Sequence, residues 1–124
     1  MKWLIGLIFV CLAVVAYTST NLSYGEAVDH DDVELTWLAK NVYFEARNQG
    51  VAGQLAVAMV TLNRVEDWRF PNTIEGVVTQ SLTRESWRTG EQVPIRNKCQ
   101  FSWYCDGKAD TINDWKTFGK IKNL

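Results

Sequence analysis

The chain has 124 residues, 47% of them hydrophobic, and a formal net charge of −1 at pH 7. This length allows one domain with one modest core. Charge is near neutral and no dense basic stripe occurs, so the composition argues against nucleic-acid binding. From residue 35 onward, the sequence contains twelve Lys and Arg residues and nine Asp and Glu residues. This mild basic excess suits an anionic polymer, but an ordinary solvated surface is the commoner explanation.

The N-terminus has the pattern of an export signal. Lys2 is followed by an uncharged apolar run, residues 3–16. A secretory signal peptide has such a basic start and short apolar run, whereas a membrane-spanning helix needs about 20 apolar residues. We therefore expect residues 1–25 to be a signal peptide or, alternatively, a membrane anchor. Residues 31–124 are expected to form a single exported domain, which touches a membrane only through that N-terminal segment.

The first helix of the domain is predicted to begin at Asp31. Glu34 stands three positions later and completes a capping box, and apolar residues then recur at helical spacing as far as Ala46. Gly50 is the expected stop. On this helix Glu45 falls about 80° from the centre of the apolar stripe, so we expect its side chain at the border between core and solvent.

The rest of the domain reads as further helices and one polar connection. Residues 53–65 are apolar on nearly all sides, which predicts a helix in the centre of the domain. A short helix follows at residues 74–80. Residues 81–98 are polar and predict a surface loop, with a strand or hairpin as an alternative. Asp110 or Thr111 is expected to cap a last helix.

The cysteines divide into one in the leader and a close pair. Cys11 belongs to the apolar leader, whereas Cys99 and Cys105 lie in the segment KCQFSWYCDG. In an oxidising compartment the pair predicts a disulfide, worth about 2–3 kcal/mol for so short a loop; two free thiols are the alternative. Together with the single histidine, His30, the pair makes a poor metal-ligand set, so no metal site is expected.

Acid–base chemistry by a carboxylate is the catalytic possibility that the sequence leaves open. His30 lies in the polar lead-in, which argues against Ser-His-Asp and Cys-His nucleophiles, and no Gly-rich phosphate loop occurs. Glu45 stands beside Tyr43 and Phe44, and apolar surroundings suit a general acid because they raise its pKa.

Two questions about Glu45 remain open at this point: whether its role is structural, and which residue would be a second carboxylate. The alternative role is structural: an interfacial charge, or an ion pair with Arg47 or Lys40. Glycoside hydrolysis also usually needs a second carboxylate, for which Asp106 and Glu75 are candidates by residue type alone.

Three blocks occur in order along the chain: YFEARNQGVAGQLAVAMVTLNRV, FPNTIEGVV, and CQFSW followed by DG. With these blocks the sequence resembles the SleB-type cell wall hydrolase family over residues 35–108. The resemblance implies a lysozyme-like α+β fold, mostly helical with a small sheet, that needs no metal or organic cofactor. It implies peptidoglycan as the substrate, cleaved by lytic transglycosylation between N-acetylmuramic acid and N-acetylglucosamine. We expect a monomer in the periplasm, cell envelope or extracellular space.

The resemblance also assigns roles. It makes Glu45 the catalytic acid/base, bordered by Tyr43 and Arg47. Substrate-binding residues would be Tyr43 and a cleft wall held by the Cys99–Cys105 bridge, namely Gln100, Ser102 and Trp103. Phe101 is expected in the core, and Trp103 suits either sugar stacking or core packing.

Other functions stay open beside this one. A peptidoglycan-binding module without turnover would share every motif, and a secreted inhibitor or toxin would bind no wall. The residues themselves do not separate hydrolysis from transglycosylation. Family domains usually continue past the DG block with a full helix and a segment rich in His, Tyr and Trp, whereas this sequence ends at Leu124. We therefore expect a shortened or minimal catalytic domain.

Overall fold

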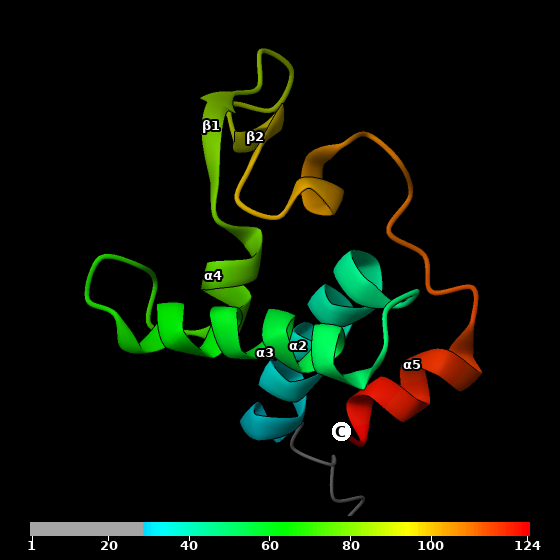
Figure 1. The fold of residues 1–124 in the computed structure, drawn as a ribbon. Coiled ribbons are helices and arrows are strands. Elements are labelled where there is room, and N and C mark those ends of the chain that lie inside the picture. The colour runs from blue at the N-terminus through cyan, green and yellow to red at the C-terminus, as the bar shows by residue number, and fades with distance from the viewer. Residues whose placement is uncertain (1–28) are drawn as a thin grey trace, which may run out of the picture.

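The computed structural model describes residues 29–124, which form a mostly helical fold with a small antiparallel sheet (Figure 1). This α+β composition agrees with the prediction. The predicted leader and Cys11 lie outside the described residues. No helix within residues 29–124 has the length and apolar character to cross a membrane. The elements in chain order are α2 (His30–Ala46), α3 (Val51–Glu66), α4 (Ile74–Thr79), β1 (Ser81–Glu85), β2 (Gln92–Cys99), the 3-10 helix η1 (Ser102–Cys105) and α5 (Trp115–Lys122).

Helix α2 begins earlier than predicted. Its N-cap is Asp29, whose carboxylate accepts a hydrogen bond from the backbone N–H of Asp31 at 3.2 Å. Glu34 does not form the predicted capping box, because its carboxylate accepts a hydrogen bond from the backbone N–H of Ile74. Ile74 is the first residue of α4, so Glu34 satisfies a free N–H at the start of a different helix. Sequence spacing cannot distinguish these two uses of the same carboxylate.

The prediction that the second helix is central is wrong for the described part of the chain. Helix α3 starts directly after Gly50, which is its N-cap and not the stop of α2, and Thr61 is its one buried residue. Five of its apolar side chains are 40–60% exposed: Val51, Leu55, Met59, Val60 and Leu62. An apolar pattern shows which surface can be buried, and residues 29–124 supply too few elements to cover all sides of this helix.

The core consists of two clusters that share helix α2. The first joins α2 to α5 and contains Ala39, Val42, Tyr43, Phe118 and Ile121. The second joins α4 to the segment around η1 and contains Val77, Val78, Phe101 and Trp103. Phe44 packs against both clusters, so the C-terminal half of α2 is the common support of the molecule.

A buried polar side chain connects three of these elements. Asn41 of α2 donates from its amide nitrogen to the hydroxyl of Thr61 in α3 at 3.0 Å. Its amide oxygen accepts a hydrogen bond from the indole N–H of Trp103 in η1 at 2.9 Å. Because buried polar groups are costly unless paired, this network fixes the position of both neighbours against α2.

The polar connection forms the hairpin that was the alternative prediction. Strands β1 and β2 pair antiparallel, with Arg84 opposite Val93 and Glu85 opposite Gln92. Gly90 lies in the turn with φ of 72°, a left-handed conformation that glycine adopts without strain. In Figure 1 the hairpin stands at one end of the molecule, beyond α4, and α5 lies at the other end.

The last helix has a different cap from either predicted residue. Asp114 is the N-cap of α5, and its carboxylate accepts a hydrogen bond from the backbone N–H of Thr117 at 2.9 Å. The predicted caps, Asp110 and Thr111, lie in the connection that precedes this helix. The side chains of Asp110 and Thr111 therefore do not cap α5.

Candidate active site

Glu45 lies in the last turn of α2, on the side that faces α3. It borders a cavity of about 210 Å³ whose other lining residues are apolar, namely Ala56, Val57, Val60 and Phe101. Three of these four come from α3, and Phe101 comes from the segment that leads into η1. Glu45 is exposed, so its carboxyl group stands at the mouth of an apolar recess and is only partly covered, which fits the predicted border between core and solvent.

Burial against these apolar side chains raises the pKa of the Glu45 carboxyl. Among residues 29–124 no ion pair involves Glu45. The two bases considered as partners lie over aromatic rings instead: the Arg47 guanidinium is 5.1 Å from the ring centre of Tyr43, and the Lys40 ammonium is 4.5 Å from that of Trp37. An acid with a raised pKa and no ion-pair partner is suited to donating a proton.

The predicted substrate-binding residues do not gather around this cavity. Tyr43 and Trp103 are 3% and 7% exposed, and both line a second cavity described below. Gln100 and Ser102 are exposed and flank Phe101 in the chain. Phe101 itself was expected in the core; it is buried there and also lines the Glu45 cavity.

Sequence reasoning missed the contribution of α3 to this site. Ala56, Val57 and Val60 belong to the helix that was predicted to be central, where no side chain would face a cleft. The signal that points to them is Glu45 at the edge of the apolar stripe of α2, because a neighbouring apolar helix must cover that edge. Neither Asp106 nor Glu75 lines the Glu45 cavity, so within the described residues it holds one carboxylate.

A larger cavity of about 430 Å³ lies on another side of α2. Its walls come from the end of α2, from Trp103 and from the connection before α5, residues 106–114. Glu45 and Arg47 are two residues apart, so their side chains are about 160° apart around the helix. The two cavities therefore lie on nearly opposite sides of the last turn of α2.

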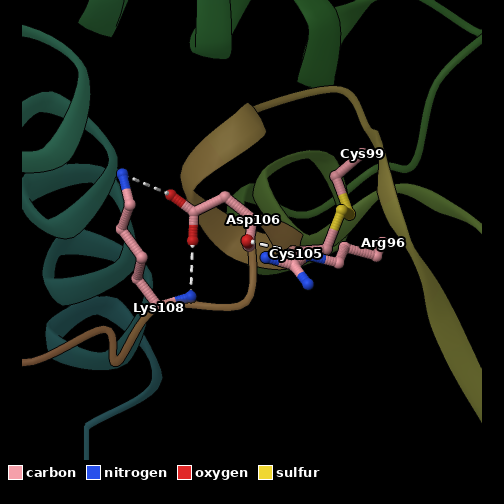
Figure 2. Close-up of a disulfide and its surroundings, with 5 residues drawn as sticks. All are labelled: Arg96, Cys99, Cys105, Asp106 and Lys108. Carbon is pink, nitrogen blue, oxygen red and sulfur yellow. Dashed lines mark hydrogen bonds and ion pairs between the residues drawn. A yellow bond between two sulfur atoms is a disulfide. The ribbon is translucent and has the colours of Figure 1, made fainter.

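A disulfide closes the loop that supplies Phe101 and Trp103 to these walls. Cys99 at the end of β2 and Cys105 at the end of η1 are joined with an S–S distance of 2.03 Å, as predicted (Figure 2). Just beyond the bridge, the Arg96 guanidinium donates to the backbone carbonyl of Asp106 at 3.1 Å. These two links hold the C-terminal end of the loop against β2.

The turn that follows the bridge requires glycine. Gly107 has φ of 83°, and a Cβ there would lie 3.0 Å from the Arg96 side chain. The Asp106 carboxylate accepts a hydrogen bond from the backbone N–H of Lys108 at 2.8 Å and forms an ion pair with its ammonium at 3.5 Å (Figure 2). The DG pair in the sequence thus marks a tight turn that directs residues 108–114 along the second cavity.

In the described range, no group of three or more His, Cys, Asp or Glu side chains is arranged to hold a metal ion. The candidate site therefore consists of one carboxyl group in apolar surroundings, without a ligand set for a metal.

The family model and the individual relatives that match this chain all concern enzymes that act on cell walls or spore cortex. A family model described as Cell Wall Hydrolase matches residues 48–121, starting just after Glu45. A spore cortex-lytic enzyme of Bacillus cereus is 44% identical over 100 residues, 81% of this chain and 36% of the relative. The spore cortex-lytic enzyme of Oceanobacillus iheyensis is 42% identical over 102 residues, 82% of this chain and 34% of the relative. That of Bacillus subtilis strain 168 is 34% identical over 86 residues, 69% of this chain and 26% of the relative. The chain thus spans about a third of the length of these relatives or less, and no solved structure matches it.

Proposed function

Because the chain belongs to the cell wall hydrolase family, we propose that it cleaves the glycan strands of peptidoglycan, with Glu45 as the general acid/base. The observation that carries this proposal is the carboxyl of Glu45 at an apolar cavity, where burial raises its pKa. A carboxyl in such surroundings keeps its proton closer to neutral pH and can deliver it to a glycosidic oxygen.

The proposed reaction is a lytic transglycosylation between N-acetylmuramic acid and N-acetylglucosamine. Protonated Glu45 gives its proton to the glycosidic oxygen as the bond from that oxygen to C1 of the muramyl residue breaks. The 6-hydroxyl of the same muramyl residue forms the new bond to C1, and its proton passes to the Glu45 carboxylate. Glu45 ends protonated, no water is consumed, and the product carries a 1,6-anhydro end.

A single carboxylate favours this route over hydrolysis. Inverting and retaining glycosidases use two carboxyl groups, about 5–10 Å apart, as acid and base or as acid and nucleophile. The described residues around the Glu45 cavity include no second one. A substrate hydroxyl that attacks from within the sugar removes the need for a base that activates water.

Four further statements belong to this proposal. Residues 31–124 act as the catalytic domain on a lysozyme-like scaffold. Gln100 and Ser102, which are exposed beside Phe101, contact the glycan, whereas Tyr43 and Trp103 support the site from their buried positions. The protein works outside the cytoplasm, and the disulfide between Cys99 and Cys105 supports this because such bonds persist in oxidising compartments. The wall itself is its partner.

Mass spectrometry of the products from purified peptidoglycan tests the proposal. We expect the oxidised protein to release muropeptides one water lighter than those with reducing ends, and Glu45→Gln to release none. Glu75→Gln, an exposed carboxylate on α4, is the matched control and should release the same products. Reducing ends would mean a hydrolase. A folded protein that sediments with the wall without any product would mean a binding module, the alternative function.

A further inference from the structure

The larger cavity, which the proposed reaction does not use, has the features of a second binding site. Its volume of about 430 Å³ lies in the range of small-ligand pockets. Its lining includes an aromatic patch, because Phe44 and Trp103 stack with ring centres 4.6 Å apart. Charged side chains of both signs surround this patch, on α2 and on the connection before α5.

The α2 wall offers hydrogen-bond donors. Tyr43 is 3% exposed, and its hydroxyl oxygen accepts a hydrogen bond from the backbone N–H of Asp114 at 3.1 Å. Among the hydrogen bonds of the described residues, none gives the proton of this hydroxyl an acceptor. The Arg47 guanidinium lies over the Tyr43 ring and forms no ion pair within residues 29–124. The hydroxyl proton of Tyr43 and the guanidinium of Arg47, both on the α2 wall, suit a carboxylate ligand.

The opposite wall offers a carboxylate. Asp106 pairs with Lys108, and Asp114 caps α5, so both of these carboxylates are already engaged. Asp110 forms no ion pair with another described residue. Burial, followed by the charge of Asp106, raises the pKa of the Asp110 carboxyl, against an opposing effect of Lys40. A cationic group of a ligand would stabilise the charged form of this carboxyl.

We propose that this cavity binds a short zwitterionic peptide, with a peptide carboxylate on Arg47 and the Tyr43 hydroxyl and a peptide ammonium on Asp110. The aromatic patch of Phe44 and Trp103 would pack against the aliphatic part of the peptide between its charges. The hydroxyls of a neutral sugar could also bond to the guanidinium and the carboxylate, but only a zwitterionic peptide would in addition neutralise both charges, which favours the peptide.

The peptide stems of peptidoglycan have this chemistry, and the choice of stem as ligand rests on the proposed function. A glycan at Glu45 would carry its stem on the muramyl residue.

Calorimetric titration of the whole protein with the stem tripeptide N-acetyl-L-Ala-D-Glu-meso-diaminopimelate, whose acetyl group replaces the amide bond to the muramyl residue, tests the inference. We expect binding, and a loss of affinity of about tenfold or more in both Asp110→Asn and Arg47→Gln, since each removes a charge-assisted hydrogen bond. Both residues are exposed, so both variants should fold, which melting curves would verify. Glu66→Gln, an exposed carboxylate at the end of α3, is the control and should bind as the unaltered protein does.

Two further measurements locate the ligand. Acetylation of the free diaminopimelate amine should weaken binding as much as Asp110→Asn does. Amide NMR signals of Asp110 and Asn113 should shift with the tripeptide, whereas those of Val60 and Phe101 should not. The inference would be overturned if the peptide did not bind, or if all variants bound it equally. It would also be overturned if the signals of Asp110 and Asn113 shifted with a chitin tetrasaccharide but not with the peptide. Product formation by the unaltered protein is scored separately, so a protein that binds the tripeptide but cleaves nothing would refute only the proposed reaction.

Discussion

At the scale of single residues, folding and chemistry make opposite demands on Glu45. Its pKa is raised by burial, so the folded protein holds this proton more tightly than the unfolded chain does. The free energy of unfolding contributed by this group therefore falls as pH rises, first through the unfolded and then through the folded pKa. The same tight hold on the proton is what a general acid needs.

The raised pKa of Glu45 gives a prediction about the stability of the folded protein. We expect Glu45→Gln to melt at a higher temperature than the unaltered protein at pH 7, because it no longer holds a charge against the apolar cavity. The difference should shrink towards about pH 3, where the unaltered carboxyl is protonated in both states. Thermal melting of both proteins across this pH range provides the measurement. A variant that is less stable at pH 7 would show that the carboxylate is well compensated and poorly suited to donate a proton.

At the scale of elements, the segment from Cys99 to Cys105 matters most, because Phe101 lines the Glu45 cavity and Trp103 lines the larger one. The loop has few regular hydrogen bonds of its own, and the Cys99–Cys105 bridge limits its freedom in the unfolded chain. Reduction should lower the free energy of unfolding by about 2–3 kcal/mol in the loop-entropy model. Melting with and without a reductant measures this change. The double variant Cys99→Ser, Cys105→Ser should melt like the reduced protein and be indifferent to reductant; an unchanged melting temperature on reduction would refute the role.

The elements also show how far the sequence could predict the structure. Helical spacing identified α2, α3 and α4 to within a few residues, because periodicity reports the local conformation directly. The caps Asp29 and Asp114 were missed, since several acidic residues near each helix start compete for the same local role. Glu34 was misjudged for a different reason: its partner, Ile74, is forty positions away, and local spacing contains no information about that contact.

At the scale of the whole molecule, the candidate site was predictable only in part. Helix geometry placed Glu45 at the border of the core, but its selection as the catalytic candidate came from the resemblance to the cell wall hydrolase family. The partners across the cavities could not be predicted, since α3, the loop around Phe101 and the connection before α5 meet α2 only through tertiary packing. The larger cavity was not predicted, although the resemblance had named Tyr43, Arg47 and Trp103, which line it. Its charged residues are scattered over α2 and residues 106–114, which the blocks of the family only partly cover.

Asn41 tests how these separately packed parts depend on one another. It is buried in α2 between Thr61 and Trp103, and so it joins the helix pair to the loop that serves both cavities. Asn41→Leu keeps the branching of the side chain but is larger, and it leaves the Trp103 indole N–H without an acceptor, which together should lower the free energy of unfolding by at least about 1–3 kcal/mol. Urea denaturation measures the loss, and Asn63→Leu on the exposed side of α3 is the control, with an expected change within about 0.5 kcal/mol. If one cooperative unit forms, Trp fluorescence and circular dichroism should shift to the same lower midpoint. A fluorescence transition that precedes the loss of helix would instead show that the η1 loop detaches from α2 before the helices unfold.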